Sequence, residues 1–177
     1  VANGLVRRDQ VLGLTFTRKA AGELAERIQR RLHRLSEFER RGLLHCEIQL
    51  PGFDVPVHCV CVHLGLIGGS RRRQMEALAE RMERLAPDGA PLIIAGDFND
   101  WRNRADNLLA HRLGLTEAFG SGRGRPARSY PSALPFFRLD RIYVRGFRVK
   151  RAEVHFGAPW AQISDHAALT AELEPLA

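Results

Sequence analysis

The chain contains no run of about 18 consecutive apolar residues, which is the length that a membrane-spanning helix needs. Its N-terminal segment, VANGLVRRDQVLGLTF, has neither the apolar stretch nor the small-residue cleavage site of a secretory signal. These absences argue against a membrane span and against secretion, and we expect a cytoplasmic protein. The sequence begins at Val1 rather than at methionine, which we interpret as the mark of a fragment or a processed form.

Cysteine is scarce, with three residues at Cys46, Cys59 and Cys61. An odd number of cysteines at these spacings does not indicate a disulfide framework. Cys59 and Cys61 lie two apart in an extended pattern and should share one face of a strand. No second pair of cysteines or histidines follows at zinc-binding spacing, so we interpret them as small buried apolar side chains.

Acidic residues are almost missing from one stretch of a basic chain. The net charge is +7, and the segment from Ser121 to Arg151 holds nine basic residues against one acid, Asp140. This segment accounts for the whole excess of positive charge. The excess favours polyanionic partners such as nucleic acid, other phosphate esters or anionic lipid head groups. A solvated, arginine-rich surface is the alternative for any single arginine.

Hydrophobic periodicity predicts a chain of mixed α and β structure. Helical spacing is found at residues 17–35, 71–86 and 103–113, and Ser70 is a candidate cap for the second of these. Strand patterns are found at residues 43–50, 55–64, 92–95, 139–144 and 147–156. Residues 120–135 form a long loop rich in Gly, Pro, Ser and Arg, which makes it a candidate functional loop, and residues 164–174 begin with a turn or cap and continue as a strand or helix.

Polar residues follow or precede several of the apolar runs. They are His63 in CVHLG, Asp97 and Asn99 in GDFND, Asp140 in LDRIYV, and Asp165 with His166 in SDH. Taken singly, these residues are more typical of turns, helix caps and surface ion pairs. Because the ends of neighbouring strands converge at one rim of a layered β fold, the set together favours a functional site.

The residue types in this set suit hydrolysis of a phosphate ester. Carboxylates without a cage of cysteine or histidine suit a hard cation such as Mg²⁺ or Mn²⁺. Asp140 can orient a histidine and stabilise its charged form. An amide beside a carboxylate can hold a water molecule while the carboxylate takes its proton. The combined chemistry is attack of water on phosphorus, with a metal acting as Lewis acid.

Four motifs, VHLGL, PLIIAGDFNDW, RSYPS with FRLDRIYV, and SDHAALTAEL, occur in this order along the chain. Together they resemble those of the endonuclease/exonuclease/phosphatase superfamily, whose fold is that of DNase I, and the resemblance covers about Arg40 to Leu173. It implies an α/β (α+β) fold, a partial DNase I-like two-sheet sandwich with flanking helices and an N-terminal amphipathic helix. It also implies a Mg²⁺-dependent phosphodiesterase, nuclease or phosphatase.

The resemblance implies roles for residues on the substrate side of the site. Asp97 would bind or deprotonate the attacking water close to the metal. Asn99 would orient that water and contact the phosphate. His63 would donate a hydrogen bond to a phosphate oxygen and aid the leaving group. Arg128, in the long loop, would contact the substrate phosphate.

The resemblance also implies a histidine–aspartate pair and a metal site. Asp140 would pair with His166, which would face the phosphorus as a cation or as a general acid and base. Asp165 would be a metal ligand and would hold Mg²⁺, or Mn²⁺, together with Asp97 and Asn99. These assignments are carried over by motif position.

One part of the superfamily pattern has no match before Arg40. Members normally open with a strand that bears a metal-site asparagine, followed by a QE motif whose glutamate is the principal metal ligand. Without that glutamate we expect weak Mg²⁺ binding and impaired activity. The alternative function is a non-catalytic, basic remnant that binds nucleic acid.

The segment VLGLTFTRKAAGELAERIQRRL, residues 11–32, is similar to a motif of UvrD/RecB-type helicases that contacts single-stranded DNA. No GxxxxGK[ST] phosphate loop accompanies it, so ATP hydrolysis is not expected. We therefore interpret residues 1–38 as a helicase-like helical segment, a fusion or fragment, and residues 39–177 as a truncated endonuclease/exonuclease/phosphatase domain. The alternative is an amphipathic helix that fills a missing position of the fold.

Overall fold

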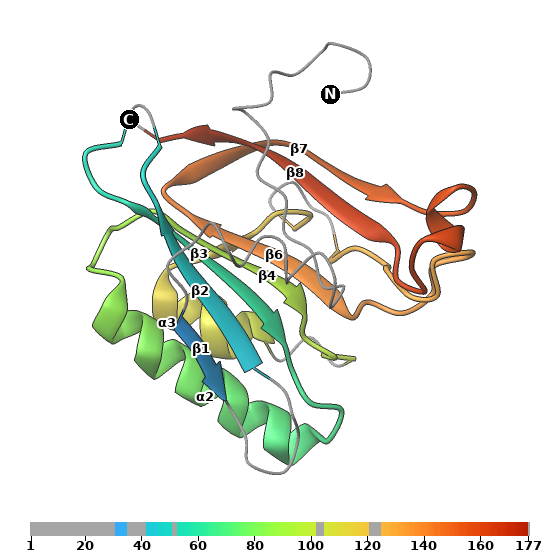
Figure 1. Ribbon diagram of the computed structural model, residues 1–177, viewed down its shortest axis with the longest axis horizontal. Helices are drawn as coiled ribbons and strands as arrows, with labels where there is room; N and C mark the ends of the chain where they lie inside the picture. The colour runs from blue at the N-terminus through green and yellow to red at the C-terminus, as the bar shows by residue number, and fades with distance from the viewer. Residues whose placement is uncertain (1–30, 35–41, 51–52, 102–104, 121–124, 177) are drawn as a thin grey trace.

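Alternating apolar residues build two β-sheets that pack face to face. The computed structural model describes residues 31–34, 42–50, 53–101, 105–120 and 125–176. The larger sheet has six strands in the order β1-β2-β3-β4-β6-β5, and the smaller pairs β7 with β8 (Figure 1). The strands are β1 (Arg31–Arg34), β2 (Gly42–Ile48), β3 (Val57–His63), β4 (Leu92–Asp97), β5 (Thr116–Glu117), β6 (Asp140–Arg145), β7 (Phe147–His155) and β8 (Ala168–Pro175).

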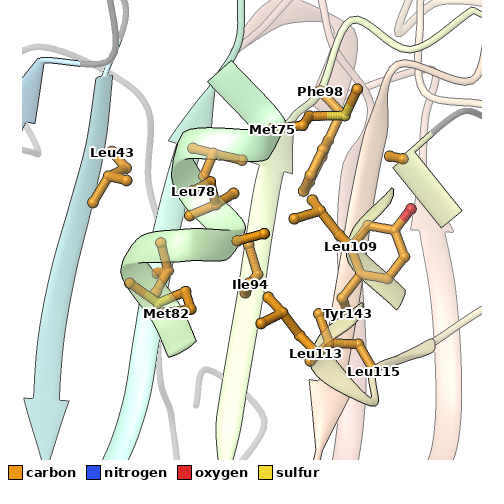
Figure 2. Close-up of a cluster of buried hydrophobic side chains, with 14 of the residues drawn as sticks. Leu43, Met75, Leu78, Met82, Ile94, Phe98, Leu109, Leu113, Leu115 and Tyr143 are labelled. Carbon is orange, nitrogen blue, oxygen red and sulfur yellow. The ribbon is translucent and has the colours of Figure 1, made fainter. Parts of the chain in front are cut away.

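Helices cover the outer face of the large sheet, on the side opposite β7 and β8 (Figure 1). The long helix α2 (Gly68–Leu85) buries a stripe formed by Met75, Leu78 and Met82. A π-helical turn, η2 (Asp106–Ala110), continues into α3 (His111–Leu113) beside it, and a short 3₁₀ turn, η3 (Trp160–Gln162), precedes β8. Figure 2 shows this stripe meeting Ile94 of β4 and Tyr143 of β6 in one apolar cluster.

The inner face of the large sheet packs against the β7–β8 ribbon. Cys59, Ile93 and Val144 from the large sheet are buried in one cluster with Phe147 of β7. Burial raises the pKa of the Cys59 thiol to about 12, so this thiol stays protonated at neutral pH. Cys59 therefore behaves as the small buried apolar side chain that its strand pattern indicated.

The structure confirms the two-sheet sandwich with flanking helices. The predicted strands are present, the helix expected at 71–86 is α2, and the final segment is the strand β8. Ser70 is not a cap, because α2 begins earlier at Gly68, and the Ser70 hydroxyl instead lies near the Gln74 amide. No helix in the described ranges is long and apolar enough to cross a membrane.

The prediction of a helix at residues 17–35 is wrong for the last turn of that helix. Residues Arg31–Arg34 form β1, which pairs antiparallel with β2 in the register Arg31↔His45 and Arg34↔Gly42. Backbone pairing with an existing sheet edge outweighs the local helical spacing here, because propensity is a weak prior against tertiary contacts. The rest of that prediction lies outside the described residues, so the division of the chain at residue 38 stays a prediction.

Gly96 fixes the distance between the two central strands. Its φ is +144°, and a Cβ at this position would lie 2.0 Å from the carbonyl oxygen of Val62 on β3. The close approach involves two backbones, so it cannot be relieved by rotating a side chain. Only glycine therefore allows β3 and β4 to pair immediately before Asp97.

We predict that Gly96→Ala lowers the free energy of unfolding by about 3 kcal/mol or more, because the added methyl group overlaps backbone and the φ angle is strained. Urea unfolding followed by circular dichroism measures this. The matched control is Gly69→Ala in α2, where nothing lies within 4 Å of the added Cβ. Helical alanine should leave stability unchanged or raise it by up to about 1 kcal/mol. Equal midpoints for Gly96→Ala and wild type would contradict this account.

Candidate functional site

Three of the predicted site residues lie side by side across the large sheet. His63, the last residue of β3, pairs in register with Asp97, the last residue of β4. Asp97 in turn pairs with Asp140, the first residue of β6. Residues directly opposite one another share a face, so all three side chains lie on the inner face, at one end of the sheet. Strand pairing alone therefore assembles this row, which we call the His63–Asp97–Asp140 row.

A tight turn after β4 holds the Asp97 carboxylate in place. The backbone N–H of Asn99 donates to Asp97 Oδ1 at 2.8 Å, and the Asn99 amide Nδ2 donates to Asp97 Oδ2 at 3.1 Å. The same Nδ2 donates to the carbonyl of Leu64 at 2.9 Å. Asn99 has φ +48°, a conformation that asparagine adopts more readily than most residues. Both side-chain amide hydrogens are thus engaged, which leaves the side-chain oxygen Oδ1 of Asn99 as the atom to meet a ligand.

His63 and Asp97 also meet through their side chains. His63 Nε2 lies 3.3 Å from Asp97 Oδ2. The His63 side chain is 47% exposed and that of Asp97 is 13% exposed. The histidine therefore lies at the open side of the row, where it can reach a ligand, and the carboxylate lies at its base.

Asp140 and His166 form the second close pair. His166 Nδ1 lies 2.7 Å from Asp140 Oδ2, and the His166 side chain is 27% exposed. The hydrogen bond to Asp140 raises the pKa of His166, burial opposes that shift, and the charges of Asp97 and Asp165 add to it. The imidazolium form of His166 is thus favoured in the site, with Nε2 as its second donor.

The long loop positions this pair through two serines that the sequence analysis did not single out. Ser129 Oγ accepts a hydrogen bond from the backbone N–H of Asp140 at 3.1 Å, and the Ser129 carbonyl accepts one from Ala167 at 2.6 Å. Ser132 donates from its backbone N–H to the carbonyl of Asp165 at 2.7 Å. Both serines are buried. Both serines belong to the RSYPS motif, and the sequence of this motif indicates only that they lie in a loop.

Arg141 is the other residue whose role the sequence did not reveal. Its side chain is 1% exposed and lies on the face opposite Asp140. The guanidinium group donates to the carbonyls of Arg138 and Asp140 at 2.8 and 2.9 Å, and to the carbonyl of Asp100 at 3.3 Å. It thereby ties the start of β6 to the turn after β4. The Asp140–Arg141 dipeptide is therefore not a surface ion pair.

Aromatic rings form one wall beside the site. The centre of the Tyr130 ring lies 5.0 Å from the centre of the His166 ring and 6.5 Å from that of the Phe137 ring. Trp101, directly after the Asp97 turn, meets Phe137 edge-to-face at 4.7 Å and is 50% exposed. We call Tyr130, Phe137 and Trp101 the aromatic wall.

Arg128 lies in a groove of about 370 Å³ with Arg125, Arg138 and Phe156. Its guanidinium carbon sits 5.7 Å from the centre of the Phe136 ring. Burial, and then the charges of Arg128 and Arg125, lower the pKa of Arg138. Like charges gathered in this way favour an anionic ligand. The structure therefore places Arg128 in an arginine groove, whereas the other predicted residues gather around the row.

The oxygen donors around the row fit a hard divalent cation. Asp97 supplies a carboxylate and Asn99 an amide oxygen, which are ligand types that Mg²⁺ and Mn²⁺ prefer. Asp165 is exposed, directly precedes His166, and its charge contributes to the raised pKa of His166. The donor set that motif position implied is thus chemically suited to Mg²⁺.

Solved structures share this fold. The human nocturnin catalytic domain, with a bound sulfate anion, superposes with a TM-score of 0.67 at 19% identity, covering 84% of this chain and 59% of that one. D. rerio TDP2, complexed with a single-stranded DNA product, has a TM-score of 0.65 at 18% identity, covering 83% and 67%. At such identities the likeness concerns the fold alone.

A closer relative by sequence is YbhP of Escherichia coli, which is 44% identical over 135 residues. The match covers 76% of this chain and 53% of YbhP, so the chain spans about half the length of that relative. The model of the Endonuclease/Exonuclease/phosphatase family matches residues 11–166. Because this family model matches most of the chain, and the chain has the sandwich fold and the motifs in the expected order, the chain belongs to the Endonuclease/Exonuclease/phosphatase family, whose members are generally hydrolases of phosphate esters.

Proposed function

We propose that this chain hydrolyses phosphate esters by direct attack of an activated water molecule, as a phosphodiesterase, nuclease or phosphatase. The observation that carries the proposal is the placement of a held carboxylate, Asp97, beside Asp140 in the row, because Asp140 in turn holds the imidazole of His166 at 2.7 Å. Water needs a base to take its proton, and the phosphoryl oxygens need positive charge as the new bond forms. Asp97 supplies the base, and His166, whose pKa is raised by its hydrogen bond to Asp140, supplies the positive charge.

Asp97 is the proposed base. Its two oxygens accept hydrogen bonds from Asn99, which fixes the direction of the carboxylate. A fixed carboxylate can receive a proton from water without reorganising. The side-chain oxygen Oδ1 of Asn99 orients the same water molecule from beside it. His63, exposed at the edge of the row, donates a hydrogen bond to a phosphate oxygen.

His166 is the proposed cation on the phosphorus side. Its Nδ1 is held by Asp140 at 2.7 Å, which leaves Nε2–H to face a phosphoryl or leaving-group oxygen. The leaving alkoxide then takes the Nε2 proton, and Asp140 stabilises the imidazolium before that transfer. No covalent enzyme intermediate is required.

Asp97, Asn99 and Asp165 are the proposed ligands for Mg²⁺ or Mn²⁺. When bound, the cation would act as a Lewis acid toward the phosphoryl oxygens and offset the charge of the neighbouring carboxylates. Asp165 is the ligand nearest to solvent, and its backbone is fixed by Ser132.

The arginine groove and the aromatic wall are the proposed contacts for the parts of the substrate beyond the reacting phosphate. The arginine groove adjoins the aromatic wall, because the Arg128 guanidinium lies over Phe136, whose ring contacts that of Phe137. A phosphate ester that extends from the row over this wall would meet the positive charge of Arg125, Arg128 and Arg138. The aromatic wall offers a flat face for a base or an apolar group. Nucleic acid and anionic lipid head groups both fit this description. The same fold accommodates nucleic acid in D. rerio TDP2, whose solved structure contains a single-strand DNA product.

A second candidate function is binding of nucleic acid without catalysis. The observation that favours it is the arginine groove, which would serve polyanion binding whether or not the row is active. Metal-dependent turnover distinguishes the two candidates, because a binding protein has none.

We predict that Asp97→Asn lowers Mg²⁺-dependent hydrolysis of bis(4-nitrophenyl) phosphate by about 10²- to 10⁴-fold, which is the usual contribution of a general base. His166→Gln should have an effect of similar size. The matched control is Asp88→Asn, an exposed aspartate in the loop after α2, which should keep wild-type turnover. Turnover by Asp97→Asn equal to that of the control would overturn the proposed base, and wild type without turnover would favour the binding function.

We predict that Asp140→Asn lowers the pKa of His166, because the amide still accepts from Nδ1–H but the negative charge is gone. The wild-type pKa lies above the ordinary 6.5, so the ion pair stabilises the fold at acidic pH, and this contribution is lost as the pH rises through the folded-state pKa. NMR titration of the His166 imidazole measures the shift. Asp165→Asn, whose charge acts more weakly, should lower the pKa less. The reverse order of the two variants would contradict the pairing.

We predict that Arg128→Gln reduces the salt dependence of binding to a fluorescent single-stranded oligonucleotide by about one in the slope of log K against log salt. The loss reflects one phosphate contact in the arginine groove. Arg84→Gln, in the last turn of α2, is the control and should keep the wild-type slope. If both variants have the same slope, the groove does not contact the strand.

A further inference from the structure

A second cluster of ligand side chains lies away from the phosphate site. Within the described ranges, His45, Glu47 and His58 place one ligand atom each within 4.8 Å of one another. Glu47 pairs in register with His58, and His45 lies two residues along β2 on the same face. His58 stands five residues before His63 on β3, a distance of about 16 Å along an extended strand, and on the opposite face of the sheet.

The two histidines already present the separation that a shared metal ion requires. His45 Nε2 and His58 Nδ1 lie 3.0 Å apart, and their rings are stacked at 5.2 Å with an interplanar angle of 13°. Two nitrogens bound to one tetrahedral ion at about 2.0–2.1 Å each would lie roughly 3.3 Å apart. The separation is therefore within a few tenths of an ångström of the value that a shared ion requires, and the two rings must turn so that both lone pairs point at the ion.

The proton between the rings does not prevent metal binding. If His45 Nε2–H donates to His58 Nδ1, a change of tautomer moves that proton to His45 Nδ1 and leaves lone pairs on both facing nitrogens. The rings are 4% and 5% exposed, so their positions are already fixed by packing. Little ordering is left to oppose binding.

Glu47 distinguishes this cluster from an ordinary buried histidine pair. A pair that only satisfies its own hydrogen bond needs no third group, yet a carboxylate oxygen of Glu47 lies within 4.8 Å of a ring nitrogen of each histidine. Glu47 is exposed, so the cluster opens to solvent on its side, where an ion can enter and a water molecule can complete the coordination.

We propose that His45, Glu47 and His58 form a transition-metal site, for which Zn²⁺ is the best chemical match. Two imidazoles and one carboxylate with an open fourth position suit tetrahedral Zn²⁺. Mg²⁺, which prefers oxygen ligands, is a poor match. The bound ion would join β2 to β3 at the end of the sheet far from the His63–Asp97–Asp140 row.

Isothermal titration of the tag-free, chelator-treated full chain with ZnCl₂ tests the proposal. Wild type should bind Zn²⁺ at this cluster, and the His45 and His58 imidazole resonances should shift in NMR spectra. Glu47→Gln and His58→Gln should each weaken this binding by at least about tenfold. His111→Gln, an exposed histidine of α3, is the matched control, and Asp97→Asn reports any Zn²⁺ bound at the phosphate site instead.

Weakened binding in Glu47→Gln and His58→Gln, with His111→Gln and Asp97→Asn retaining the event, supports the site. Unchanged affinity in Glu47→Gln, or loss of all Zn²⁺ binding in Asp97→Asn alone, overturns it. If His58→Gln does not fold, Glu47→Gln decides the question, because the exposed glutamate can be replaced without disturbing the core.

Discussion

The pairing of β4 with β3 on one side and with β6 on the other is the constraint on which the site depends. Gly96 lets the β4 backbone approach Val62 closely, and the register that follows sets His63, Asp97 and Asp140 in one row. A slip of one residue in either pairing would turn a member of the row to the opposite face. The apolar clusters on both faces oppose such a slip, because each strand buries alternate residues on each side.

The residues around the row orient its side chains and set their charge. Asn99 holds Asp97, Asp140 holds His166, and the long loop holds both β6 and the segment before β8 through Ser129 and Ser132. The site thus joins the two sheets, since Asp97 belongs to the large sheet and His166 leads into the small one. A carboxylate and an imidazolium held in this way suit proton transfer to and from a phosphate ester.

The strands and α2 could be predicted from the sequence because alternation of apolar residues reports burial directly. The Asp140–His166 contact followed from motif resemblance, since no local pattern links residues 26 apart. The prediction of helix for Arg31–Arg34 was wrong because the spacing of apolar residues does not report pairing with a distant strand such as β2. Ser129, Arg141 and Gly96 act through backbone contacts with distant segments, and such contacts leave no local signal. The roles of the site residues stay predictions.

The central claim is that an oxygen from water becomes bonded to phosphorus at this row while the bond from phosphorus to the leaving oxygen breaks. Hydrolysis of bis(4-nitrophenyl) phosphate in H₂¹⁸O with Mg²⁺, followed by mass spectrometry of both products, tests it most directly. The account predicts that one ¹⁸O atom enters the phosphate monoester and none enters the nitrophenol. Label in the nitrophenol, or no turnover by the folded wild-type chain, would contradict it.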